Sequence, residues 1–178
     1  EKNTELYLSQ NIPLNPLLQI SREFTKDGEI VVLYESNKHK EDTLKHYFND
    51  IHFTHFSVIL YNLIQQVVLT NEKTEMYINM QNSQFDLLVF NSGKLIFYNS
   101  FPHKNEEDFL YYTLAMAEQY SLDTDLYSIN FLGKYTRFNS YYEALKNYQK
   151  KIEFTELEAL DSLDLDNHPA PYFFNLMA

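Results

Sequence analysis

A run of three predicted strands, joined by short turns, constrains this sequence most. The first strand, residues 74–80, alternates apolar Met and Ile side chains with more polar ones, which is the period of a β-strand. The second and third strands cover residues 85–90 and 95–101. The turn between them holds Gly93, whose backbone suits the positive φ of a hairpin. Together the three strands predict an antiparallel meander that opens a sheet.

A helix follows this meander at once. Asn105 can cap that helix, the acidic residues after it complement the helix dipole, and Phe109 and Leu114 lie on its predicted buried face. Ser140 and Glu143 form a capping box for a later helix. The elements expected after residue 120 are a strand over 126–132, a helix over 141–149 and a strand over 152–154. The order from residue 74 is β-β-β-α-β-α-β, which predicts an α/β fold with a five-stranded mixed sheet flanked by helices.

The first 73 residues are interpreted as a smaller α/β unit. Residues 6–8 are a short strand or a helix turn, and residues 17–24 are an edge strand. The remaining expected elements are a buried strand over 30–34, a helix from Glu41, a short strand over 51–53 and an amphipathic helix over 56–68. Residues 70–74 are the expected boundary between a first domain, residues 1–73, and a second, residues 74–178.

Composition excludes several classes of function. The net charge of −11 repels nucleic-acid backbones and anionic lipid heads, so we expect no nucleic-acid partner and no membrane association. No apolar run reaches the ~20 residues of a membrane span. The sequence has no Cys, which leaves no disulfide and no thiolate nucleophile, and only 3 Gly, which argues against a glycine-rich phosphate loop. A cytoplasmic bacterial protein is the expectation.

The pattern resembles a Bacteroidetes family of unknown function, DUF3822, with an actin-like ATPase fold. The residues that carry the resemblance are Ile30 to Tyr34, Phe48 to Phe56 with His55, Phe85 to Pro102, Glu107 to Phe109, Gly133 and Tyr172 to Leu176. The resemblance implies two ribonuclease-H-like halves. Residues 1–73 would then be a partial first half, because too few residues precede Ile30 to supply its opening strands. Residues 74–178 would be a complete second half with a docking tail.

The resemblance also places a nucleotide site, and the residues at that site are degenerate. The hairpin that would hold phosphate carries Asn79, Gln81, Asn82 and Ser83, and the later adenosine site carries Gly133 followed by Lys134. An Asn brings no full negative charge to Mg²⁺ and cannot act as a general base. The bulk of Lys134 would hinder a closely packed adenosine. We therefore expect no catalysis, and no ATP or Mg²⁺ as a resident cofactor.

Other chemistry-bearing residues receive structural interpretations. His52 and His55 lie at an expected strand end, where residues three apart point to opposite faces, so no metal site is predicted. Asp123 and Asp125 are typical of a turn before a strand. Residues 153–166 hold six acids and no base, as expected of a solvated segment. The apolar run at residues 172–177 is expected to dock onto the body or to bind a partner.

Three functional hypotheses stay open. The first is a non-catalytic interaction or scaffold module, with a protein partner or a second copy of the chain as its ligand. The second is a nucleotide-binding ATPase whose site is completed by a missing N-terminal part. The third is a small-molecule sensor that uses the groove between the two halves. Fold analogy alone does not choose among them.

Overall fold

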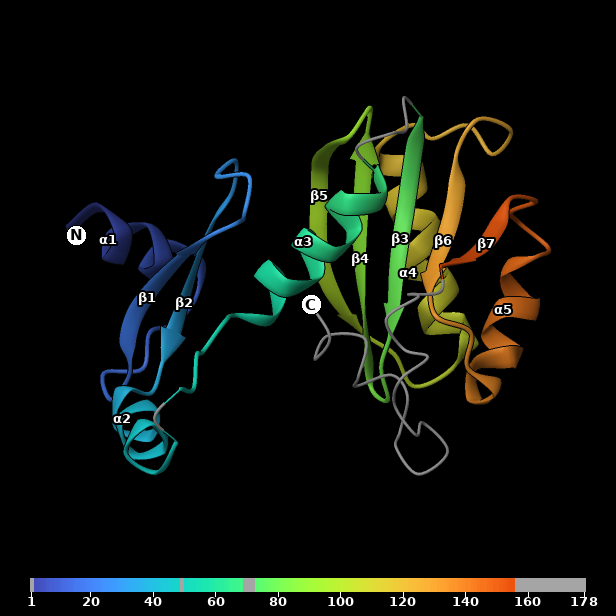
Figure 1. Cartoon of the computed structure of the whole chain (residues 1–178). Helices are drawn as coiled ribbons and strands as arrows, with labels where there is room; N and C mark the ends of the chain where they lie inside the picture. The colour runs from blue at the N-terminus through green and yellow to red at the C-terminus, as the bar shows by residue number, and fades with distance from the viewer. Residues whose placement is uncertain (1, 49, 69–72, 156–178) are drawn as a thin grey trace. The chain divides into compact units, whose positions relative to one another are not determined.

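The computed structural model describes residues 2–48, 50–68 and 73–155, and Figure 1 shows how their helices and strands are arranged. The chain divides into two compact units, with the boundary between Leu63 and Ile64. The first unit holds α1 (Lys2–Asn11), β1 (Gln19–Phe24), β2 (Val31–Ser36), α2 (Lys38–Tyr47) and the larger part of α3 (Phe56–Val68).

The strands of the first unit form a two-stranded antiparallel hairpin, in which Phe24 lies opposite Val31. The expected edge strand over 17–24 is therefore confirmed from Gln19, but the expected strand–helix–strand–helix unit is wrong. Residues 51–53 form no strand. They are only three residues, with His52 between two apolar side chains, and so short a segment does not specify a pairing without a neighbouring strand. They instead lead into α3, where the amphipathic helix expected over 56–68 is confirmed.

Of two helices in the first unit, one agrees with a sequence-based expectation and the other starts earlier than expected. Residues 6–8 lie inside α1, so the helical alternative holds for them. Helix α2 begins at Lys38, ahead of the expected Glu41, because the Asn37 side chain caps it by accepting from the Lys40 backbone N–H at 3.0 Å. Its apolar face is not buried, since Leu44, Tyr47 and Phe48 are all exposed.

The second unit is built on one mixed sheet, as the sequence predicts. Its strands run in the order β5-β4-β3-β6-β7, where β3 is antiparallel to β4 and parallel to β6. The elements are β3 (Thr74–Met80), β4 (Gln84–Asn91), β5 (Lys94–Pro102), α4 (Glu106–Gln119), β6 (Ser128–Leu132), a 3-10 turn (Thr136–Phe138), α5 (Asn139–Leu145) and β7 (Ile152–Thr155).

The sequence predicted where two helices and one strand of this unit begin, and only part of this is confirmed. Asn105 caps α4 as predicted, with its side-chain oxygen accepting from the Asp108 N–H at 3.0 Å. The capping box of Ser140 and Glu143 is wrong, because a 3-10 turn runs directly into α5 and no side chain caps that helix. Strand β6 starts at Ser128 instead of Leu126, whose side chain is 71% exposed.

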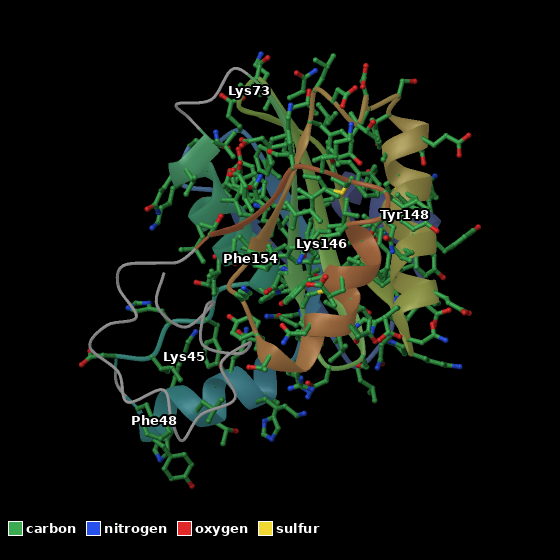
Figure 2. The ribbon with its side chains drawn as sticks, turned by 90° about the vertical axis from the view of Figure 1, so that its right-hand side faces the viewer. Lys45, Phe48, Lys73, Lys146, Tyr148 and Phe154 are labelled. Atoms are coloured by element: carbon green, nitrogen blue, oxygen red, sulfur yellow. The ribbon has the colours of Figure 1, made fainter. Side chains whose placement is uncertain are left out.

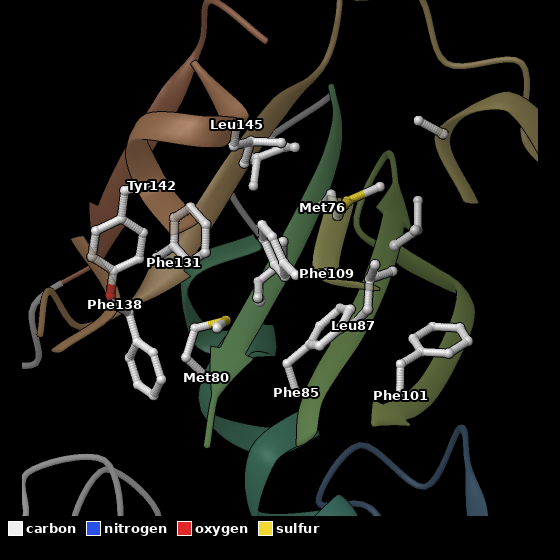
Figure 3. Close-up of a cluster of buried hydrophobic side chains, with 14 of the residues drawn as sticks. Met76, Met80, Phe85, Leu87, Phe101, Phe109, Phe131, Phe138, Tyr142 and Leu145 are labelled. Carbon is white, nitrogen blue, oxygen red and sulfur yellow. The ribbon is translucent and has the colours of Figure 1, made fainter. Parts of the chain in front are cut away.

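One aromatic-rich core lies between the sheet and helices α4 and α5 (Figure 3). Phe109 of α4 is central to it, with its ring centroid 5.0 Å from that of Phe85 and 5.6 Å from that of Tyr141. Alternate residues of β3 and β4 point to the opposite face of the sheet, where Tyr77, Asn79 and Leu88 are also buried. The two central strands are therefore buried on both faces, as is usual in α/β folds.

No helix in the described part of the chain is long and apolar enough to cross a membrane. The acidic segment beyond Thr155 and the apolar run at 172–177 lie outside the described residues.

Candidate functional site

The expected nucleotide-site residues fall at one edge of the main sheet. Strands β3 and β6 are parallel neighbours, with Ile78 beside Phe131. Both strands therefore end at the same edge, which places the turn after β3 near Gly133 and Lys134 after β6. The carboxyl edge of parallel strands is where ligands commonly bind in α/β proteins. The sheet register thus brings the two parts of the expected site to one region.

A buried carboxylate that the sequence analysis missed lies beneath the turn. Asp86 of β4 has no exposed surface, and it accepts hydrogen bonds from Asn79 Nδ2 at 2.9 Å, Gln81 Nε2 at 2.7 Å and Ser100 Oγ at 2.5 Å. Asn79, Asp86 and Ser100 are directly paired across β3, β4 and β5, so their side chains form a row on one face of the sheet. A lone acid in the apolar strand Phe85–Phe90 is the signal that could have revealed it.

The backbone of the turn is held from below by His103, which the sequence analysis also missed. The His103 N–H donates to the Ser83 carbonyl at 3.0 Å, and ring Nε2 lies 2.9 Å from the Gln81 carbonyl. A carbonyl only accepts, so Nε2 carries a hydrogen. Ring Nδ1 lies 3.1 Å from the Tyr141 hydroxyl on α5. Buried His103 therefore ties the turn to the helical layer.

The expected turn residues differ in what they present to solvent. Asn79 and Gln81 direct their amide nitrogens to Asp86, whereas Asn82 and Ser83 are exposed at the tip. The Asn79 side-chain oxygen is buried without a hydrogen-bond partner among the described residues. Two of the four polar side chains at the expected phosphate hairpin are thus directed inward.

Gly133 has a structural role that needs no ligand. Its φ is +82°, and an added Cβ would lie within 2.6 Å of Tyr135 Cζ. Its N–H donates to the Thr155 carbonyl at 3.0 Å, which joins the ends of β6 and β7. Burial raises the pKa of the neighbouring Tyr135 hydroxyl to about 12, with a further contribution from Tyr142, so this phenol stays neutral. The positive φ favours glycine here, and a Cβ would also require the end of the Tyr135 side chain to shift.

The Lys134 side chain points toward β7, the strand at one edge of the sheet. Its ammonium nitrogen lies 5.2 Å from the ring centroid of Phe154, which Figure 2 labels on β7. This is the geometry of a cation–π contact. The Lys134 charge is therefore directed to an aromatic ring of the same sheet.

The histidines and the paired aspartates behave as structural groups. His55 Nδ1 accepts from the Ser57 N–H at 3.2 Å at the start of α3, and the His55 ring lies 4.5 Å from that of Tyr34. Asp123 Oδ1 accepts from the Asp125 N–H at 2.9 Å, which is a local turn contact. Among the described residues no three His, Cys, Asp or Glu side chains gather in a way that could hold a metal ion.

The mixed sheet, its helical layer and this edge define an α/β protein with an actin-like ATPase fold. The chain belongs to the family described as "Protein of unknown function (DUF3822)", whose pattern matches residues 1–152. No curated protein matches the sequence.

Two solved structures give the fold comparison. A protein of Bacteroides thetaiotaomicron VPI-5482, described as having an actin-like ATPase fold and unknown function, is 19% identical with a TM-score of 0.76. The match covers 87% of this chain and 60% of that protein, so the chain spans less than two thirds of its solved relative. The second structure is Pelota of Archaeoglobus fulgidus, which is 10% identical with a TM-score of 0.35. That match covers 90% of this chain and 52% of Pelota, and its TM-score is too low to support a shared fold.

Proposed function

We propose that this chain is an interaction or scaffold module of the actin-like fold that performs no nucleotide chemistry. In this proposal residues 74–178 belong to its second half and residues 1–73 to part of its first half. The observation that carries the interaction role is the apolar surface of the first unit. Among the described residues there, the exposed large hydrophobic side chains outnumber the buried ones by ten to five, whereas those of the second unit include 20 buried and five exposed.

One face of the β1–β2 hairpin is the contact surface in this proposal. We define the hairpin face as Ile20, Arg22, Phe24, Val31, Leu33 and Glu35, which alternate on the two paired strands. Phe24 and Val31 lie directly opposite each other and are 56% and 45% exposed. Neither β1 nor β2 has a second strand neighbour among the described residues. Open strand edges beside apolar side chains tend to pair with another chain.

The arrangement at the sheet edge supports a non-catalytic role. A phosphate-binding hairpin needs backbone N–H groups or charged ligands that face the nucleotide. Here the side-chain amides of Asn79 and Gln81 are directed to Asp86 and the Lys134 charge to an aromatic ring, while the carbonyls of Ser83 and Gln81 accept from His103. A nucleotide would have to displace contacts that hold the turn together.

Light scattering across a range of protein concentrations tests the interaction role, with a second copy of the chain as the first partner considered. We expect a dimer whose population rises with concentration. The double change Phe24→Lys and Val31→Lys should abolish it, because two charges on this face oppose burial. The control is Tyr111→Lys, since Tyr111 is 69% exposed on α4. A monomer at every concentration, or a dimer unaffected by the double change, would overturn self-association through the hairpin face.

Calorimetric titration with ATP and Mg²⁺ tests the other two hypotheses. We expect no saturable heat from the chain. Saturable binding of ATP that is lost in Asn82→Ala, at the exposed tip of the turn, would support the ATPase hypothesis instead. Binding of another small metabolite without ATP would support the sensor hypothesis.

A further inference from the structure

A pocket lies at the end of the main sheet opposite to the candidate site. Its volume is about 270 Å³. Its walls come from Thr74 at the start of β3, Asn91 at the end of β4, Ile96 of β5 and residues within 120–127, the segment that leads from α4 to β6. All of these residues belong to the second unit, so the pocket is separate from the hairpin face and from the turn around Asp86.

The loop between α4 and β6, which forms one wall of the pocket, is fixed by backbone hydrogen bonds. Helix α4 ends in a left-handed residue, Ser121 with a φ of +51°, and the Leu122 N–H reaches back to the Ala117 carbonyl at 2.8 Å. Further along the loop, the Asp123 carbonyl accepts from the Leu126 N–H at 2.8 Å. The position of Asp123 in the pocket wall is therefore defined by the fold.

Asp123 gives the pocket a negative charge that no neighbouring side chain balances. Among the described residues it is the only charged side chain that lines the pocket, and it makes no ion pair with any of them. Asp125 differs, because its carboxylate lies 3.5 Å from the Lys150 ammonium group. Lys73 and Lys94 adjoin lining residues, but neither of them lines the pocket. The wall at Asp123 therefore favours a positively charged ligand.

The C-terminal end of α4 adds partial negative charge to the same wall. Tyr120, which caps this 14-residue helix, lines the pocket. The last turn of α4 carries no basic side chain, so the helix does not itself compensate the negative end of its dipole. Such a helix end stabilises a nearby cation. The helix end and the Asp123 carboxylate are independent features, and both favour positive charge.

The remaining walls suit an apolar group. Ile96 and Leu126 are large aliphatic side chains that are 41% and 71% exposed. The register of β5 against β4 shifts at Ile96, which leaves this residue without a partner of its own on β4. The Tyr120 ring is held against the Phe97 ring, with 5.5 Å between their centroids. A ligand that combines a cationic group with a hydrocarbon body would contact both kinds of wall.

We propose that this pocket binds a small primary amine in its ammonium form. The ammonium group pairs with the Asp123 carboxylate beside the end of α4, and the hydrocarbon body covers Ile96 and Leu126. An ammonium group only donates hydrogen bonds, and the side-chain oxygens of Thr74 and Asn91 in the walls accept them. The pocket is smaller than the roughly 300–1,000 Å³ of sites for drug-sized ligands, which restricts it to small molecules. This site is independent of the association proposed for the hairpin face.

Titration of the full chain with benzylamine at neutral pH, where this amine is protonated, tests the proposal through the NMR shifts of the backbone amides. Benzyl alcohol is the neutral probe, because it has the same ring and a hydroxyl in place of the ammonium group. Two variants each remove one negative charge from the same loop. Asp123→Asn keeps the side-chain oxygen that accepts from the Asp125 N–H. Asp125→Asn is the matched control, since Asp125 does not line the pocket.

We expect benzylamine to shift the amide signals of residues 120–127 saturably and to bind at least about tenfold more tightly than benzyl alcohol, as one charge-assisted hydrogen bond allows. Asp123→Asn should remove that difference, whereas Asp125→Asn should change the affinity by less than about twofold. The absence of saturable shifts, equal affinities for the two probes, equal losses in the two variants, or shifts that map outside the pocket would each overturn the amine site. The same spectra show whether each variant is folded. None of these outcomes bears on self-association through the hairpin face, which belongs to the first unit.

Discussion

At the residue scale, Asp86 is unusual because it is an acidic residue buried inside a sheet. It is a carboxylate with no exposed surface, and it accepts hydrogen bonds from an Asn, a Gln and a Ser. Three donors, from β3, the turn after it and β5, converge on it and offset the loss of water. Asp86 thus holds the side chains of the turn from inside the protein. In an ATPase, polar groups of this turn would face the nucleotide instead.

Replacing Asp86 should therefore destabilise the whole second unit. Asp86→Ala leaves donors of Asn79 and Gln81 without an acceptor, and each unsatisfied buried group costs about 1–3 kcal/mol. We expect a loss of at least about 2 kcal/mol in the free energy of unfolding, measured by urea denaturation. Ser100→Ala, which removes one donor at an exposed strand end, is the control and should cost less. Equal stability of Asp86→Ala and the parent would contradict this role.

His55 gives stability a dependence on pH. Burial lowers its pKa, while the charge of nearby Glu23 acts in the opposite direction. A lowered pKa means that the folded protein favours the neutral ring, which accepts from the Ser57 N–H. Its contribution is complete above the unfolded pKa of about 6.5 and is lost as the pH falls through the folded value. In His55→Asn, which can still cap α3, urea midpoints should fall less between pH 7 and pH 5 than in the parent. An identical fall in both proteins would exclude this explanation.

At the scale of elements, helix α4 fixes the core through one side chain above all. Phe109 is fully buried and contacts the rings of Phe85 and Phe131, as Figure 3 shows, whereas Leu114 is only half-buried. The sequence predicted both to be buried alike. Phe109→Ala should lower the free energy of unfolding by about 3–5 kcal/mol and Leu114→Ala by about 1 kcal/mol. Urea melts that show similar losses for the two changes would contradict this order.

Prediction from sequence succeeded where a pattern is long or chemically specific. The strands from 74 to 101 and the cap at Asn105 follow from alternation and from one side-chain oxygen, and both are confirmed. The strand predicted over 51–53 and the capping box predicted at Ser140 were wrong, because whether such short segments form them depends on their tertiary neighbours. The same limit applies to the site. The residue types of the turn after β3 indicated that it carries no charged side chain. Only the pairing of β3 with β4 reveals that Asp86 lies beside Asn79.

At the scale of the whole molecule, the contrast between the two units governs what each can do. The second unit has a core of its own between sheet and helices. The first has one hairpin and few buried side chains. A unit with so little core is stable only together with other surfaces, because small domains bury too little apolar area. The association proposed for the hairpin face would supply such a surface.

Helix α3 also limits how this molecule can be divided during evolution. It begins at Phe56 in the first unit, and its last turn, from Ile64, belongs to the second. Recombination at that boundary would cut a continuous helix and leave an end too short to persist by itself. Genetic exchange that preserves folding must therefore keep Phe56–Val68 intact. The two units are expected to be inherited as one piece, and insertions to accumulate elsewhere.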